Sequence, residues 1–161
     1  MALVRQWERE IRAKVTVSHR LSVRMITQGK KVTWDDIRTF DVVLTTYGIL
    51  GAEFKRWEQH MEKRKLEGQA LNHDEPSMRK IFPLFGPKSL FYRVILDEAQ
   101  CIKNKTTLAA RASKHLVAST RFCLTGTPMM NNVGELYSLI HFLRIKPYNE
   151  WTRFQEVSNY H

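Results

Sequence analysis

Residues 91–100 read FYRVILDEAQ, an aromatic and β-branched run that stops at two adjacent carboxylates. The run predicts a buried strand over 91–96, and the polar residues after it predict a turn. A second run, RFCL at 121–124, leads into TGTP at 125–128. The alanine-rich segment 107–116 between them predicts a helix. Strand, helix and strand in this order indicate a βαβ unit with parallel strands.

The same alternation continues on both sides of this unit. Residues 41–48, DVVLTTYG, predict a buried strand that ends in a polar turn. Apolar residues at helical spacing predict a helix over 133–143, begun by a capping box of Asn132 and Glu135. We therefore expect an α/β fold: a parallel sheet with helices on both faces, formed by one domain over residues 1–161.

Residues 1–90 give weaker signals. Helical spacing predicts a helix near the N-terminus, and the alternation of VTVS at 15–18 predicts a short strand. Thr33 is expected to cap a short helix. Apolar residues at 54, 57 and 61 mark one face of a charged helix, whereas residues 67–80 show no period. We expect residues 53–90 to be a helix and surface-loop insertion.

Composition limits the possible partners. Lys and Arg number 26 against 16 Asp and Glu, and the resulting formal charge of +10 favours polyanions such as nucleic acid, although many basic domains bind none. The two cysteines are too few for a disulfide framework. No apolar run is long enough to cross a bilayer, so we expect no membrane partner.

The chemistry is expected where the strands end. Ligands of an open parallel sheet bind at the carboxyl ends of its strands, and the ends here carry Thr45 and Thr46, Asp97 and Glu98, and the turn 125–127. Carboxylates after a buried strand suit phosphoryl transfer, with Asp97 holding a hydrated Mg²⁺ and Glu98 orienting the attacking water. Taken alone, such a pair is more often a solvated surface feature, and a Thr-Gly-Thr turn can simply end a strand.

Four segments together resemble one family. VILDEAQCIKN at 94–104 and FCLTGTPMMNNVGELYSL at 122–139 resemble motifs II and III of Swi/Snf-type, superfamily-two helicase-like ATPases. DVVLTTY at 41–47 resembles motif Ib, and LVRQWE at 3–8 resembles the helix after motif Ia. Gln100 and the segment IKPY at 145–148 are most similar to the post-replication-repair branch, whose full-length members often carry a RING finger.

The resemblance implies a site. The fold would be part of the first RecA-like lobe, and the cofactors would be ATP and Mg²⁺. Asp97 would hold the magnesium ion through water, and Glu98 would serve the hydrolytic water. By the same likeness Gln100 would also lie at the nucleotide. The resemblance implies that the nucleotide would be coupled to DNA and to the second lobe by Gln100, Thr125, Gly126 and Thr127. It also implies that DNA would be contacted by Thr45, Thr46 and Lys103.

The resemblance also implies where the protein works. Its partners would be double-stranded DNA, chromatin and a second RecA-like lobe, and its location the nucleus. Many family members have His where Gln100 stands; Gln donates and accepts hydrogen bonds but does not titrate near neutrality, so the coupling should persist without a proton switch.

One expected element is not in the sequence. No G-x-x-x-x-G-K-[ST] segment occurs between residues 1 and 161. The phosphate-binding loop and the second lobe with its arginine finger would therefore have to come from outside this chain, which we expect to be a fragment. Because an arginine finger alone contributes about 10³–10⁵ in rate, the isolated chain should hydrolyse ATP negligibly. The alternative is a truncated, non-catalytic nucleic-acid-binding module that acts through its basic surface.

Overall fold

The computed structural model describes residues 2–29, 31–69, 76–127 and 133–158. The chain divides into two compact units, residues 1–89 and residues 90–161. No helix in the described ranges is long and apolar enough to cross a membrane.

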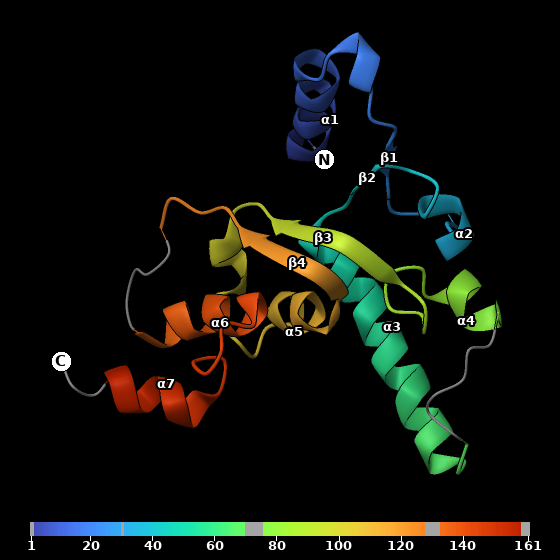
Figure 1. Cartoon of the computed structure of the whole chain (residues 1–161). Helices are drawn as coiled ribbons and strands as arrows, with labels where there is room; N and C mark the ends of the chain where they lie inside the picture. The colour runs from blue at the N-terminus through green and yellow to red at the C-terminus, as the bar shows by residue number, and fades with distance from the viewer. Residues whose placement is uncertain (1, 30, 70–75, 128–132, 159–161) are drawn as a thin grey trace. The chain divides into compact units, whose positions relative to one another are not determined.

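Unit 1 pairs two short parallel strands with four helices (Figure 1). Strand β1 pairs in register with β2, Val23 opposite Val42. Thr33 caps α2 by accepting a hydrogen bond from the Asp36 backbone nitrogen, as expected, and Thr46 caps α3 by accepting one from Ile49. In chain order the elements are α1 (Ala2–Lys14), the 3₁₀ turn η1 (Val17–His19), β1 (Val23–Met25), α2 (Trp34–Ile37), β2 (Val42–Leu44), α3 (Tyr47–Leu66) and α4 (Pro76–Ile81).

Two expectations for unit 1 differ from the structure. The strand predicted at 15–18 is wrong: hydroxyls of Thr16 and Ser18 lie within 3.3 and 2.9 Å of the His19 ring nitrogen Nδ1 and favour a local turn, η1. The strand forms instead at 23–25, where β2 supplies a partner.

Residues 67–80 were expected to be a surface loop. Residues 76–81 instead form helix α4, in which Met78 is buried, and Phe82, Leu84 and Phe85 after the helix are buried as well. Phe85 packs on Phe54 of α3 with ring centroids 5.3 Å apart. These contacts join positions about 30 apart along the chain, which the local periodicity cannot reveal.

Unit 2 is the predicted βαβ unit. Strands β3 and β4 are parallel, with Leu90 opposite Val117 and Leu96 opposite Cys123. The predicted helix between them forms, and Thr107 caps it by accepting a hydrogen bond from Ala110. Asn132 of the predicted capping box lies outside the described residues. The elements are β3 (Leu90–Leu96), the 3₁₀ turn η2 (Ala99–Ile102), α5 (Leu108–His115), β4 (Val117–Cys123), α6 (Val133–Leu143) and α7 (Trp151–Ser158).

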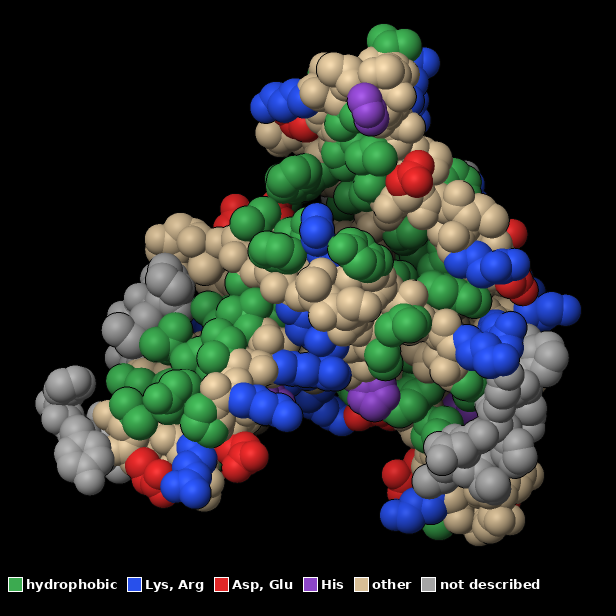
Figure 2. Space-filling model, in the orientation of Figure 1, with side chains coloured by type: hydrophobic (Ala, Val, Ile, Leu, Met, Phe, Trp, Pro, Cys, Tyr) green, Lys and Arg blue, Asp and Glu red, His purple; other side chains and the backbone are tan. Residues whose placement is uncertain are grey.

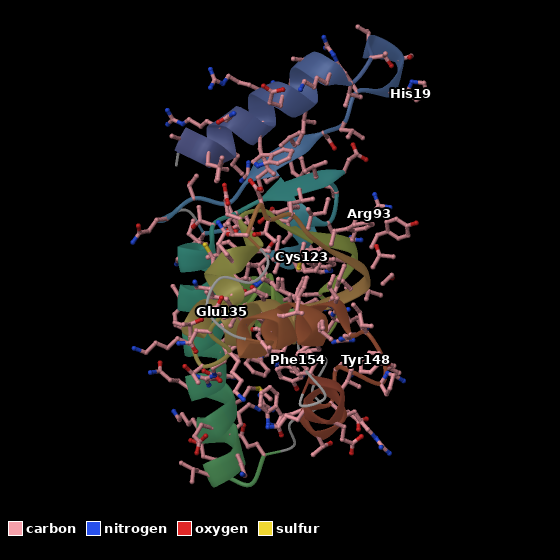
Figure 3. The ribbon with its side chains drawn as sticks, turned by 90° about the vertical axis from the view of Figure 1, so that its left-hand side faces the viewer. His19, Arg93, Cys123, Glu135, Tyr148 and Phe154 are labelled. Carbon is pink, nitrogen blue, oxygen red and sulfur yellow. The ribbon has the colours of Figure 1, made fainter. Side chains whose placement is uncertain are left out.

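The core of unit 2 lies between β4 and its helices. Phe142 of α6 is 1% exposed, and Tyr137 packs edge-on against Trp151 of α7 with ring centroids 4.7 Å apart. Phe154, labelled in Figure 3, packs against Tyr137 from the same helix as Trp151. Parallel strands and covering helices confirm the expected α/β class.

Strand β3 is less buried than its composition predicted. Tyr92 is 74% exposed and Ile95 54% exposed, and Leu96 is the buried apolar residue at its end. Phe122 on β4 is also exposed, whereas its neighbour Arg121 points to the helix side and contacts Phe142. Burial of a strand requires cover on both faces, and a β-rich composition cannot show whether that cover is present.

Candidate functional site

The acidic turn is fixed to the end of the neighbouring strand. The Leu124 backbone nitrogen donates to Leu96 at 2.8 Å, and the Ala99 nitrogen donates back to Leu124 at 2.9 Å. Since β3 and β4 are parallel, this pairing continues the ladder past both strands and places Asp97 and Glu98 beside the start of the 125–127 turn. The predicted meeting of these two strand ends within unit 2 is therefore present in the structure.

Glu98 has a strained backbone. Its φ of 49° and ψ of 50° lie in the left-handed region, which costs a residue with a β-carbon about 1–2 kcal/mol. Its backbone nitrogen donates to Asp97 Oδ1 at 3.0 Å, a local bond that helps to hold this conformation. Strain of this kind persists where the surroundings enforce it, and it is common at functional sites.

A continuous set of hydrogen bonds joins the two strand ends. Gln100 Nε2 donates to Glu98 Oε2 at 2.6 Å, and Thr125 Oγ1 donates to Gln100 Oε1 at 2.7 Å. The Thr127 backbone nitrogen donates to Thr125 Oγ1 at 3.1 Å. Gln100 uses both ends of its amide and so bridges the Glu98 carboxylate and the Thr125 hydroxyl.

Gly126 contributes differently from its neighbours. A β-carbon added to it would meet no atom within 4 Å, so the structure gives no steric reason for glycine at this position. Its role in coupling rests on the resemblance alone.

Helix α6 contacts the end of the turn η2, which follows the acidic pair. Ile102 is fully buried, and its carbonyl accepts a hydrogen bond from Ser138 Oγ. Lys103 Nζ lies 3.6 Å from Glu135 Oε1, and Glu135, labelled in Figure 3, is 8% exposed. Sequence reasoning assigned Lys103 to DNA and Glu135 to a capping box, and it missed Ser138, whose one signal was a polar residue within the apolar 133–143 helix.

The carboxylates offer the donor set that Mg²⁺ prefers. Asp97 and Glu98 supply oxygen atoms, and no His, Cys or further acidic side chain joins them in a metal-binding group within the described ranges. A single carboxylate that reaches a hydrated ion fits this composition. The nearby Cys123 thiol has a pKa raised to about 11 by burial and is therefore a poor metal ligand at neutral pH.

Thr45 and Thr46 lie in unit 1, after β2. Thr46 Oγ1 accepts a hydrogen bond from the Ile49 nitrogen at 3.2 Å and so begins helix α3. Thr45 Oγ1 is buried and has no hydrogen-bond partner among the described residues. A buried hydroxyl without a partner is uncommon in folded proteins.

Carboxylates follow one parallel strand, and Gln100 links them to hydroxyls after the next. This arrangement is the one expected of a RecA-like lobe. A family model described as the SNF2-related domain matches residues 1–160, and the chain belongs to that family.

Curated relatives agree with this assignment. The chain is 41% identical over 158 residues to the "Uncharacterized ATP-dependent helicase C23E6.02" of Schizosaccharomyces pombe, covering 97% of this chain and 14% of that protein. It is 38% identical to the "ATP-dependent helicase ULS1" of Saccharomyces cerevisiae, covering 96% of this chain and 10% of the relative. It is 34% identical to the "DNA repair protein RAD5A" of Arabidopsis thaliana, covering 98% and 13%. The chain therefore spans about a seventh of these proteins or less, and the expected likeness to the repair branch is confirmed.

A solved structure supports the fold. The "Sulfolobus solfataricus SWI2/SNF2 ATPase core in complex with dsDNA" matches 95% of this chain and 26% of that chain, with a TM-score of 0.56 and 25% sequence identity. The expected RecA-like architecture is thereby confirmed.

Proposed function

We propose that this chain is part of the first motor lobe of an ATP-dependent DNA translocase that acts in chromatin remodelling or DNA repair in the nucleus. The observation that carries the proposal is the hydrogen-bonded link from Glu98 through Gln100 to Thr125. It gives a hydrolytic carboxylate and a neighbouring turn a direct mechanical connection. The curated relatives named as ATP-dependent helicases support the reaction class.

The residues have distinct roles in this proposal. Asp97 would hold Mg²⁺ through a water molecule, and a metal–nucleotide complex bound there would supply the charge neutralisation that phosphoryl transfer needs. Glu98 accepts a hydrogen bond from the attacking water and orients it. Gln100 fixes the second oxygen of Glu98, Oε2, and by the family resemblance would lie beside a bound nucleotide. Thr125 and Thr127 transmit conformational changes at the nucleotide site to DNA and to a second RecA-like lobe.

In this proposal DNA is contacted by the residues that follow strand β2 and by the basic surface. We assign Thr45 and Thr46 to the phosphates of double-stranded DNA, supported by the unpartnered Thr45 hydroxyl. Lys103 remains a candidate contact, but its ammonium group lies against the buried Glu135 carboxylate. Any DNA contact that Lys103 makes therefore competes with that ion pair.

The test uses the motor that results when this chain is joined to a phosphate-binding loop and a second lobe. Glu98→Gln keeps the shape of the side chain and its oxygen acceptor but removes the charge that orients water. We expect ATP turnover stimulated by duplex DNA to fall to background while ATP binding is kept. Glu156→Gln is a matched control, because Glu156 is an exposed carboxylate paired with Arg153 in the same unit. Turnover that survives Glu98→Gln would refute the role of Glu98.

The second candidate, a non-catalytic nucleic-acid-binding module, is favoured by the formal charge of +10. It predicts salt-dependent DNA binding by this chain with no ATP binding in any longer protein that contains it. ATP binding by the assembled motor separates the two candidates.

A further inference from the structure

Helices α5 and α6 of unit 2 each bury one serine completely, and the two hydroxyls differ in their bonding. Ser113 of α5 and Ser138 of α6 are both 0% exposed. Ser138 Oγ donates to the carbonyl of Ile102, which lies 36 residues earlier in the chain. Ser113 Oγ has no hydrogen-bond partner among the described residues. The two serines therefore allow a comparison of a buried hydroxyl with and without a hydrogen bond.

The position of Ser138 on α6 is otherwise suited to an apolar residue. Hydrophobic side chains gather over α6 and α7 on the face seen in Figure 2, and Leu139 and Phe142 beside Ser138 on α6 are buried. Alanine fits the same space as serine and is the better helix former. Packing and helix propensity therefore do not account for the hydroxyl of Ser138, whereas its bond to Ile102 does.

The carbonyl that Ser138 engages belongs to the last residue of η2, the four-residue turn that contains Gln100. At the start of this turn, the Ala99 nitrogen donates to the Leu124 carbonyl at 2.9 Å, so the turn is attached to the residue after β4. At the end of the turn, Ile102 is 0% exposed and is attached to α6 through Ser138. Gln100 therefore lies between two fixed points of a short turn.

An ion pair adds to the attachment at the end of η2. Lys103 Nζ lies 3.6 Å from Oε1 of Glu135, which precedes Ser138 by three residues and so lies on the same side of α6. A lysine side chain has a long flexible stem, and its ammonium group can follow a carboxylate as the backbone moves. The Ser138 hydroxyl has a short side chain and bonds the backbone directly. Ser138 therefore restrains the backbone of η2 more closely than the ion pair does.

The position of η2 determines whether Gln100 can make both of its hydrogen bonds. Gln100 Nε2 donates to Glu98 Oε2 at 2.6 Å, and Gln100 Oε1 accepts from Thr125 Oγ1 at 2.7 Å. Since these two partners lie at different strand ends, a movement of the turn toward one of them lengthens the bond to the other. A separation of about 3.6 Å no longer counts as a hydrogen bond, so a shift of about 1 Å would break one of the two.

We propose that Ser138 is a positioning residue for ATP hydrolysis: through the Ile102 carbonyl it holds η2 where Gln100 bonds both Glu98 and Thr125. This inference rests on the proposed function, because it assigns Ser138 to the same reaction. Ser138 contacts neither the nucleotide nor the attacking water in this proposal and acts only through Gln100. Its loss should therefore slow the chemical step and leave the binding of ATP unchanged.

The first test measures ATP turnover in the motor used for Glu98→Gln, in which this chain is joined to a phosphate-binding loop and a second lobe. Ser138→Ala should lower kcat by about 10- to 100-fold, as expected for a misplacement of about 1 Å, with KM for ATP unchanged. Ser138→Cys keeps a weak donor and should recover part of the rate. Ser113→Ala is the matched control, because it removes an equally buried hydroxyl without a partner, and it should keep the wild-type kcat.

The second test measures the hold on Gln100 directly and needs no ATP. Exchange of the Gln100 side-chain amide protons with solvent is followed by NMR in this chain. It should be faster in Ser138→Ala than in wild type and in Ser113→Ala. The backbone amide of Ala110, a fully buried residue of α5, reports the opening of unit 2 as a whole and should exchange at the wild-type rate in all three. Equal acceleration at Gln100 and Ala110 would mean a general loss of stability and would overturn the positioning role.

Glu98→Gln in the same motor distinguishes a failure of this inference from a failure of the proposed function. Turnover that survives Glu98→Gln overturns the proposed function. Turnover that is lost in Glu98→Gln but has the wild-type kcat in Ser138→Ala overturns only the role of Ser138. A fall in kcat that is the same in Ser138→Ala and Ser113→Ala also overturns it, because the lost bond to Ile102 would then have no specific effect.

Discussion

Glu53 on α3 should make the stability of unit 1 depend on pH in an unusual direction. Its side chain is 4% exposed, and its Oε1 accepts a hydrogen bond from the Leu84 nitrogen at 2.7 Å. Burial raises the pKa of this carboxyl from 4.5 to about 7, although the bond from Leu84 and the nearby Arg56 oppose the rise. A carboxyl group that resists ionisation in the folded state favours the fold only while it is protonated.

The size of the effect follows from the pKa change. In the unfolded chain Glu53 ionises near its ordinary pKa of 4.5, and in the folded chain near 7. Between these values the folded state binds more protons, so its stability falls as the pH rises. The stabilisation is complete below pH 4.5 and lost above pH 7, a total of about 3 kcal/mol at about 1.4 kcal/mol per pKa unit.

The perturbation is Glu53→Gln, which keeps an oxygen acceptor for Leu84 and removes the titration. Urea unfolding between pH 4 and pH 8, followed through the amide signals of residues 50–57 and 84–85, gives the free energy of unfolding of unit 1. The free energy of unfolding of the wild type minus that of the variant should fall by about 3 kcal/mol from pH 4 to pH 8. Glu62→Gln, an exposed position on the same helix, should change stability little at any pH. A difference between wild type and Glu53→Gln that is flat with pH refutes the reasoning.

Three further outcomes are expected. Thr107→Ala should lower the free energy of unfolding of unit 2 by about 1 kcal/mol, measured by urea unfolding, because Thr107 caps α5; no change would mean that the cap is not important. Phe142→Ala should cost about 3–5 kcal/mol in the same assay, since that ring is 1% exposed, and a loss below 1 kcal/mol would contradict its core position. At pH 8 about 0.1% of the Cys123 thiol should be ionised, given its pKa of about 11, so iodoacetamide should label the exposed Cys101 first by mass spectrometry; equal rates would contradict the burial of Cys123.

The site was predictable where the signal was local. The acidic residues at Asp97 and Glu98 directly follow one β-rich run, and the Thr-Gly-Thr turn at 125–127 directly follows another, so the sequence indicated both strand ends. Parallel pairing then brings such ends to one edge as a matter of geometry. The left-handed conformation of Glu98 gave no sequence signal, because it depends on the bonds that continue the ladder past both strands.

Local signals also failed in identifiable places. The alternation at 15–18 is that of a strand, but a strand forms only with a partner, and β2 pairs with residues 23–25. Residues 76–85 have no period because their apolar side chains pack against α3 from a short helix and turns. Glu53 reads as one more charge on a charged helix, yet the segment at 84–85 covers it.

The sequence by itself determined the α/β class, the βαβ unit, the helix cap at Thr33 and the family, because these depend on residues near one another or on motifs in a fixed order. Tertiary structure decided which polar groups meet: Gln100 with Thr125, Lys103 with Glu135, and Leu84 with Glu53. The physical reason is that burial and hydrogen-bond partners are set by segments distant along the chain, so neither side chain of such a pair carries the information alone.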